Sequence, residues 1–317
     1  MSLMSTLRKI EKANRRMIRE AERRQRELQR RQKELAKMAE LEQARYEVEL
    51  YENRIDLIKS VHKECSKQWD WETIKSSSPP FPQDGMGPNE QKARNQLNNY
   101  KPGFLDKVFN RSEVKIKELE KEIDKAKQKD IEELKEWQEL VDLAKKVLQG
   151  DTAVYLQVLQ ELSPFADIGE LGSSLNFKII NLKIMEVELN VHSESVIPQE
   201  VKTLTQAGKI SVKKMPKGQY FELYQDYVCG CVLRVAREIF AILPLEKVYI
   251  NAIGETLNTQ TGHMDEKPIL SVMIPRNTLE KLNFNNIDCS DSMSNFVHNM
   301  KFKKTQGFEP VEKLPIS

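Results

Sequence analysis

The chain has little of what secreted and membrane-spanning proteins need. It contains four cysteines in 317 residues, Cys65, Cys229, Cys231 and Cys289, which are too few and too scattered for a disulfide framework. No apolar run approaches the ~20 residues that span a bilayer. Charges recur every few positions from Arg8, so the start of the sequence lacks the apolar core of a secretory signal. These absences predict a soluble, cytoplasmic protein in a reducing compartment, with no membrane span.

The chain also lacks an excess of charge of either sign. Lys and Arg number 50 against 48 Asp and Glu, a net charge of +2. The composition as a whole therefore gives no argument for a nucleic-acid or membrane partner. Hydrophobic residues make up 39% of the sequence, enough for at least one core, which excludes wholesale disorder and a collagen-like chain.

Residues 8–33 form the most basic stretch, which we call the basic arm. It contains no proline or glycine and few apolar residues, so it favours a long helix that opens near Ser5. Such a helix could be a solvated or oligomerising coiled-coil arm, could bind the phosphates of duplex DNA, or could contact an anionic protein or membrane surface. It lacks the aromatic residues on which single-stranded binders stack bases. Its candidate anion-binding residues are Arg15, Arg16, Arg19, Arg23, Arg24, Arg26, Arg30 and Arg31.

Two long amphipathic helices are predicted in the first half of the chain. Apolar residues recur at steps of three and four over residues 38–61, on a helix running to about Lys67. A second stripe begins near Ser112, a candidate cap, skips one step at Asp130 and is closed by Gly150. Three prolines in four residues predict a structured connector between them. We expect an antiparallel helical hairpin, or a parallel coiled coil with a second copy, and the two can coexist.

The sequence pattern changes after residue 150. A short helix is expected over 152–162, and the period then becomes two, as in Met185–Val191, which is typical of a strand with one face in a core. Residues 220–243 predict a strongly apolar buried helix. Further expected elements are β-rich runs over 247–253 and 269–274, a helical turn over 277–282 and a helix over 290–298. The predicted fold is therefore α+β, a long N-terminal helical hairpin or coiled coil followed by a compact mixed α+β domain. The expected boundaries are 1–75 for the long charged helix, 76–110 for the connector, 111–150 for the second helix and 151–317 for the domain.

One group of acidic and basic residues could carry metal chemistry. Magnesium-dependent nucleases often place an acidic residue on one strand and a Glu-x-Lys triplet on the next, because carboxylates hold the metal and the lysine stabilises developing charge. Here Glu186 and Glu188 precede Glu200 and Lys202, although that triplet lacks the apolar residues of a strand. His192 follows on the polar side of the first strand. Under this alternative Mg²⁺ would be the cofactor; otherwise we expect no cofactor and no metal.

Two further features of the second half have simpler interpretations. Cys229 and Cys231 lie two apart on the apolar helix and point about 200° away from each other, so they cannot share a metal or form a disulfide. We interpret them as small buried residues around a close-packing Gly230. A small basic loop precedes the helix and could bind phosphate, but it lacks P-loop spacing, and surface lysines are the simpler interpretation. Its lysines include Lys209, Lys213 and Lys214.

Five strings in the sequence stand out: YENRIDLIKSVHKEC, DWETI, IPQEVKTLTQAGKISVKKMP, YQDYVCGCVLRVAREIFAILP and MKFKKTQGFEPVEKL. Together they resemble a family of largely uncharacterised bacterial proteins in which a charged coiled coil precedes a domain with these segments. The resemblance covers most of the chain from about Glu47 onward. It implies a bacterial cytoplasmic protein with a helical N-terminal half, and it assigns no activity to individual residues.

These patterns favour a non-enzymatic interaction or scaffold protein, in which a coiled-coil arm is linked to a partner-recognising α+β domain. We expect a protein partner or self-association through the helices. The alternative is a nucleic-acid-binding protein or a divergent metal-dependent nuclease in bacterial genome defence. The two differ in one geometric respect, because carboxylates more than about 8 Å apart cannot bridge a single divalent ion.

Overall fold

The structure, a computed structural model, divides into two compact units. The helical unit comprises residues 70–149, and the sheet unit comprises residues 40–69 together with those from 150 onward. The basic arm lies outside the described residues. The structure describes residues 40–83, 85–101, 112–162, 165, 174–191, 196–206, 208–257 and 261–316.

The helical unit is built on one long helix, α6. This helix has 37 residues and is therefore about 55 Å long. Two shorter helices pack along it, and the side chains of Asp130 and Trp137, both on its predicted stripe, bind α4 and the end of α3, respectively. The helices are α3 (Trp71–Lys75), α4 (Pro88–Asn99) and α6 (Ser112–Leu148).

The skipped step at Asp130 has a structural reason. The Asp130 carboxylate accepts hydrogen bonds from the backbone N–H groups of Asn89 (3.1 Å) and Glu90 (2.8 Å) in the first turn of α4. Gly87, at the N-cap of α4, has no side chain of its own to do this, and a Cβ there would lie 2.2 Å from the Asp130 carboxyl carbon. Burial would raise the pKa of Asp130, but these hydrogen bonds outweigh it and lower the pKa. A residue of α6 therefore caps α4.

The partner of α6 differs from our prediction. We expected a connector over 76–110 and a hairpin of the two long helices, whereas α4 forms within the connector and packs on α6. Pro88 is compatible with this helix because it occupies the first helical position, where no N–H is needed. The first long helix belongs to the sheet unit. The prediction of Ser112 as the start of α6 and of Gly150, with φ of +77°, just past its end is confirmed.

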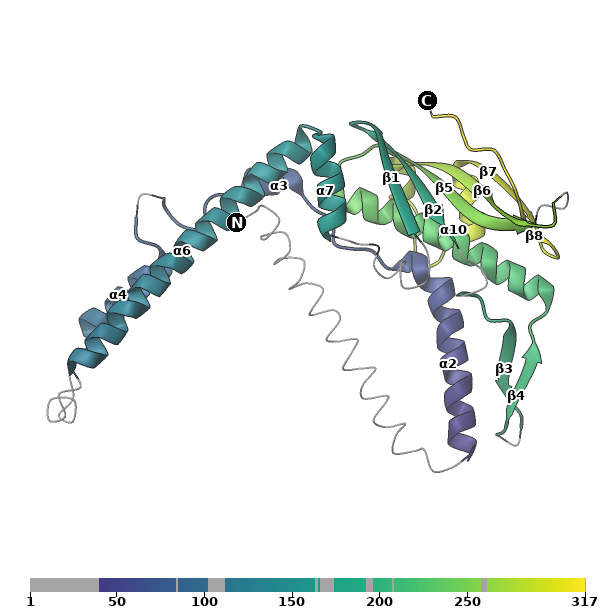
Figure 1. The fold of residues 1–317 in the computed structure, drawn as a ribbon, viewed down its shortest axis with the longest axis horizontal. Helices are drawn as coiled ribbons and strands as arrows, with labels where there is room; N and C mark the ends of the chain where they lie inside the picture. Colours follow the sequence, from purple (N-terminus) through teal and green to yellow (C-terminus); the bar gives the residue numbers. More distant parts are fainter. Residues whose placement is uncertain are drawn as a thin grey trace. The chain divides into compact units, whose positions relative to one another are not determined.

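The sheet unit carries a six-stranded sheet of order β1-β2-β5-β6-β7-β8. Strands β2 and β5 are parallel and joined through helix α10 (Lys217–Ile242), and the other neighbours are antiparallel. Helix α10 lies along one face of this sheet (Figure 1). The strands are β1 (Ser174–Asn181), β2 (Ile184–Asn190), β5 (Lys247–Leu257), β6 (Met264–Pro275), β7 (Val297–Lys303) and β8 (Gly307–Glu309).

The core lies between α10 and this face of the sheet. Met185, Val187 and Leu189 of β2 are buried and its polar side chains lie on the other face, which confirms the predicted strand. Cys229 and Cys231 are also fully buried, and Cys229 Sγ lies 4.0 Å from Met300 Sδ of β7. A Cβ on Gly230 would lie 2.7 Å from the Val61 side chain. The interpretation of this pair as small residues around a close-packing glycine is therefore confirmed, and all four cysteines are free.

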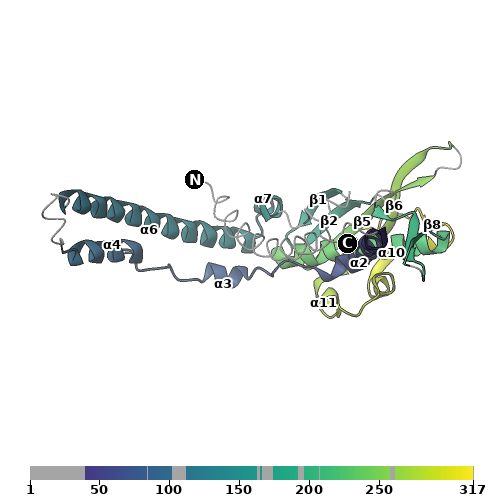
Figure 2. The same cartoon turned by 90° about the horizontal axis from the view of Figure 1, so that it is seen from below.

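Of the remaining elements of the sheet unit, α2, η1, α7 and α12 pack against α10, and the view from below shows α2 beside it (Figure 2). Helix α2 packs against α10 and the β3–β4 ribbon, and it ends earlier than the predicted Lys67. The Glu200–Lys202 triplet is part of a strand, contrary to our prediction, because it pairs with β4 in a hairpin. The helix expected over 290–298 ends at Asn295, and β7 follows. These elements are α2 (Glu40–Ser60), η1 (Val61–Lys63), α7 (Thr152–Leu162), β3 (Glu200–Leu204), β4 (Ile210–Lys214), α11 (Arg276–Leu279), α12 (Cys289–Ser292) and η2 (Met293–Asn295).

Candidate functional site

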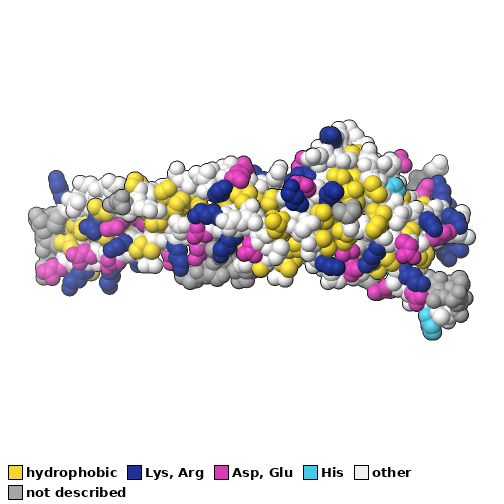
Figure 3. Space-filling model, turned by 90° about the horizontal axis from the view of Figure 1, so that it is seen from above, with side chains coloured by type: hydrophobic (Ala, Val, Ile, Leu, Met, Phe, Trp, Pro, Cys, Tyr) yellow, Lys and Arg dark blue, Asp and Glu magenta, His cyan; other side chains and the backbone are white. Residues whose placement is uncertain are grey.

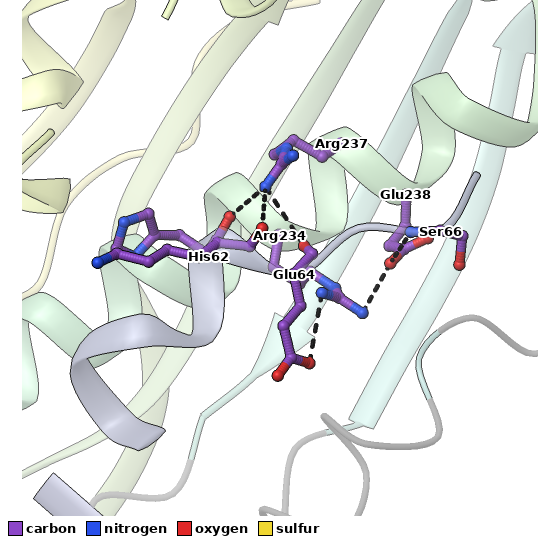
Figure 4. Close-up of polar contacts among 7 residues, drawn as sticks. His62, Glu64, Ser66, Arg234, Arg237 and Glu238 are labelled. Carbon is purple, nitrogen blue, oxygen red and sulfur yellow. Dashed lines mark hydrogen bonds and ion pairs between the residues drawn. The ribbon is translucent and has the colours of Figure 1, made fainter. Parts of the chain in front are cut away.

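The chain that follows α2 crosses helix α10 in residues 61–69, which we call the crossing segment and which consist of η1 and an irregular stretch. Its last residue, Trp69, donates its backbone N–H to the carbonyl of Ala241 (2.8 Å). From Tyr227 to its end, helix α10 is apolar except for charged residues at 234, 237 and 238, a spacing that places them on one helix face. Figure 4 shows these three side chains among the residues of the crossing segment. We take this cluster as the candidate functional site.

Arg237 binds the end of the helix that enters the crossing segment. Its Nη1 donates to the carbonyl oxygens of His62, Lys63 (3.0 Å) and Glu64 (3.3 Å), and its guanidinium carbon lies 4.0 Å from the ring centroid of Phe284. These carbonyls lie at the end of η1, where they have no N–H donors within the helix and carry partial negative charge. Burial lowers the pKa of Arg237, yet a guanidinium remains charged at neutral pH. Arg237 is thus a C-terminal cap supplied by another helix.

Beside it lies a buried ion pair, Arg234 with Glu238. Arg234 Nη2 is 2.8 Å from Glu238 Oε1, and the backbone N–H of Ser66 donates to the same oxygen (3.0 Å). Glu238 is 0% exposed, and Glu64 Oε2 is 3.6 Å from Arg234 Nη1. Within the described residues, Glu238 Oε2 and Arg234 Nη1 have no hydrogen-bond partner. Burial raises the pKa of Glu238, although Arg234 and Ser66 partly oppose this.

His62 is the third polar group buried here. It is 3% exposed, and neither ring nitrogen has a hydrogen-bond partner of ordinary geometry among the residues that the structure describes. Burial lowers its pKa, Lys63 and Arg237 lower it further, and the Phe284 backbone and Asp288 partly oppose them. His62 is buried because Gly230, which has no Cβ, allows the crossing segment to approach α10 closely.

The chemistry of this cluster is that of an anchor. Burial raises the pKa of the Cys65 thiol to about 11, so at neutral pH it is protonated and a poor nucleophile. Both Arg237, as donor, and Glu238, as acceptor, form hydrogen bonds with the backbone of the crossing segment. The cluster therefore fixes the end of α2 to α10. Sequence reasoning missed it, although three charged residues on one face of the otherwise apolar stretch from Tyr227 to Ile242 were a visible signal.

The residues of the nuclease alternative lie in two different sheets. Glu186 and Glu188 are on β2 of the six-stranded sheet, and Glu200 and Lys202 are on β3 of the ribbon. Their partners also differ. Glu186 accepts from Asn251 Nδ2 (3.0 Å), Glu188 pairs with Lys313, and Lys202 Nζ lies 3.1 Å from Glu47 of α2. His192 lies outside the described residues, and the described part of the chain contains no group of three or more His, Cys, Asp or Glu placed to hold a metal.

The lysines of the basic loop lie on the ribbon. Lys209 is in the turn between the strands, and Lys213 and Lys214 are on β4, opposite Val201 and Glu200. All three side chains are exposed. The arginines of the basic arm, from Arg15 to Arg31, fall outside the described residues. The structure therefore supplies an exposed basic ribbon and leaves DNA binding by the arm as a prediction.

A shallow acidic cleft of about 250 Å³ lies beside α10. Its lining includes Glu222, Asp226 and Asp288, together with Lys59 of α2. Burial first and the charge of Asp288 second raise the pKa of Asp226 to about 6, although Lys59 partly opposes them. A carboxyl that loses hydration and faces another carboxylate titrates above its usual range. We therefore expect the charge of the cleft to change near pH 6.

Comparison with known proteins identified no relative. No protein-family model, no curated protein and no solved structure matches the chain. Within the described residues, no helix is both long and apolar enough to cross a membrane. The resemblance to bacterial coiled-coil proteins stays a prediction, and the function has to be inferred from the geometry of the chain itself.

Proposed function

We propose that this chain is a non-enzymatic interaction protein of the bacterial cytoplasm, in which a helical arm self-associates and the α+β domain recognises a partner. The observation that carries the proposal is the incomplete cover on the first half of α6. Its apolar stripe there consists of Ile116, Leu119, Ile123 and Ala126, and none of the four is fully buried.

The cover is incomplete because α4 offers few apolar side chains. Its sequence, PNEQKARNQLNN, contains one alanine and one leucine in the helix interior, Ala93 and Leu97. On α6, Ile116 remains 37% exposed. An apolar stripe at helical spacing that the described part of the chain covers only in part is typical of a helix that packs against a second one. A second copy of α6 would cover it.

The buried charges at the crossing segment support a scaffold. A buried ion pair contributes little net stability, because desolvation offsets much of the attraction between the charges. Such pairs are more useful for specifying one arrangement than for adding stability. In this chain they specify how the end of α2 is held on α10, which suits a protein whose task is to present helices. The four free cysteines are consistent with a reducing compartment.

Nucleic-acid binding is the alternative, and one observation favours it. The β3–β4 ribbon exposes Lys209, Lys213 and Lys214, and two-stranded ribbons enter the grooves of DNA in several binding proteins. A salt series with duplex DNA separates the two. Affinity that falls steeply with salt, and falls again in a Lys213→Glu, Lys214→Glu variant, would favour DNA as the partner.

Two substitutions on α6 test the helical proposal. Ile116→Glu places a charge on the stripe, whereas Val114→Glu places the same charge two residues away, where the side chain points about 200° from the stripe and is already 58% exposed. We expect Ile116→Glu to weaken self-association in sedimentation velocity by at least tenfold and Val114→Glu to leave it unchanged. Equal association in all three proteins, or a monomer throughout, would refute the proposal.

A further inference from the structure

A row of polar residues crosses the six-stranded sheet on the face opposite α10. Strand register places Asn176, Glu188, Asn251, Ser271 and Asn299 side by side on five successive strands. We call this set the polar row. Its centre is buried, because Asn251 is 2% and Ser271 1% exposed. Ser271 Oγ donates to Asn251 Oδ1 (2.7 Å), so the two side chains hold each other in place.

The row is covered by residues 311–316 of the same chain, which we call the strap. The backbone N–H of Leu314 donates to Ser271 Oγ (2.9 Å), and Asn299 Nδ2 donates to the carbonyl of Glu312 (2.9 Å). The Lys313 ammonium pairs with the Glu188 carboxylate. Figure 3 shows this face, where hydrophobic side chains gather with charged ones among them. The polar row therefore contacts the strap at three consecutive residues.

These contacts are of the kind that read an extended peptide. Two of them bind backbone groups of the strap, which any sequence would offer, and the third selects a lysine. Val311 and Leu314 are half-buried, whereas the side chains of Glu312 and Lys313 are exposed. The strap belongs to no strand, and among the residues that the structure describes only its Val311 bonds to another backbone group, the carbonyl of Pro268 (2.8 Å). A segment held in this way opens without unfolding the sheet beneath it.

We propose that the polar row is a peptide-binding site, occupied here by the chain's own strap. Its partner is an extended peptide with the pattern apolar-x-Lys-apolar, as in Val311–Leu314. Glu188 selects the lysine, and Ser271 and Asn299 hold the peptide backbone. The inference rests on the proposed function, since it names the partner class that the α+β domain recognises. The strap then acts as a competitor that a partner peptide must displace.

The test opens the strap in the full-length chain and leaves the row intact. Leu314→Pro removes the N–H that binds Ser271, and Lys313→Glu repels Glu188. The probe is a fluorescent peptide of residues 309–316, EPVEKLPI. We expect it to bind the opened variant at least tenfold more tightly than the wild-type chain, because only the opened variant has a vacant row. Lys267→Glu, the same charge change at another site of the sheet unit, should bind the peptide as weakly as wild type.

Two further measurements make the result decisive. Ser271→Ala added to the opened variant should weaken peptide binding severalfold, with circular dichroism checking that the fold is kept. In the wild-type chain, the amide of Leu314 should exchange with deuterium faster than the amides of β6. The inference is overturned if the opened variant binds no better than wild type, if Ser271→Ala changes nothing, or if Leu314 exchanges as slowly as β6. Self-association of the helices is measured separately, so a peptide failure with intact self-association refutes only this inference.

Discussion

Breaking the buried pair at the crossing segment should destabilise the chain strongly, and removing both partners should not. Glu238→Leu leaves the Arg234 guanidinium buried without its 2.8 Å partner, and losing one member of such a pair costs about 3–5 kcal/mol. Glu64, 3.6 Å away on an exposed side chain, compensates in part, so we expect about 3–4 kcal/mol. The double variant Arg234→Met, Glu238→Leu removes the stranded charge. The free energy of unfolding of the double variant should lie within about 1 kcal/mol of the wild-type value, and the remaining loss reflects the Ser66 N–H, which no longer has an acceptor.

Urea unfolding at pH 7, followed by circular dichroism, measures these differences. Glu246→Leu is the matched control, because Glu246 pairs with Lys183 at the surface, where an ion pair contributes about 0–1 kcal/mol. The reasoning is refuted if the double variant is as unstable as Glu238→Leu, since the loss would then lie in the missing packing or hydrogen bonds and not in a stranded charge. A cost below about 1 kcal/mol for Glu238→Leu would also refute it.

Three further predictions concern titration and capping. His62 has a lowered pKa in the folded chain, so the stability that neutral His62 contributes is present above pH 6.5 and is lost as the pH falls through the folded pKa. The midpoint of urea unfolding should therefore fall less for His62→Met than for wild type between pH 7.5 and 5.5. The pKa of Asp226 is raised from its ordinary value of 3.8 to about 6 in the folded chain. The stability that the protonated carboxyl contributes is therefore present below pH 3.8 and is lost as the pH rises through 6. Asp226→Asn should be more stable than wild type at pH 8, by about 1 kcal/mol after solvent screening, and no more stable at pH 4. Asp130→Ala should lower the free energy of unfolding by about 1–2 kcal/mol and speed hydrogen exchange at the amides of Asn89 and Glu90. The control Asp142→Ala, which removes an exposed ion pair with Lys145, should do neither. Unchanged exchange at these amides in Asp130→Ala would contradict the capping role.

Local patterns in the sequence were enough to locate the elements with strong periodicity. Helix α10, strand β2 and helix α6 were predicted because each has an apolar face that its own residues reveal. Helix α4 was missed because the prolines before it predict an irregular connector, although proline at the first helical position, as in Pro88, also favours the start of a helix. Strand β3 was missed because its stability depends on contacts that the triplet alone does not show. Its backbone pairs with β4, and Lys202 pairs with Glu47 of α2.

The candidate site could not be predicted in the same way. Arg237 binds the carbonyl of His62, 175 positions earlier in the sequence, and no local pattern encodes such a contact. The burial of His62 likewise depends on Gly230 of another helix. The polar row requires strand register, which places residues from 176 to 299 in line. Long-range pairing of this kind is decided by the packed fold, and sequence periodicity carries little information about it.

The mass of the chain in solution decides whether it assembles through its helices. Sedimentation equilibrium of the wild-type chain over a series of micromolar concentrations gives this mass without any substitution. Self-association through the helices gives a weight-average mass that rises with concentration from 36.9 kDa towards twice that value. A mass that stays at 36.9 kDa at every concentration would rule out such assembly.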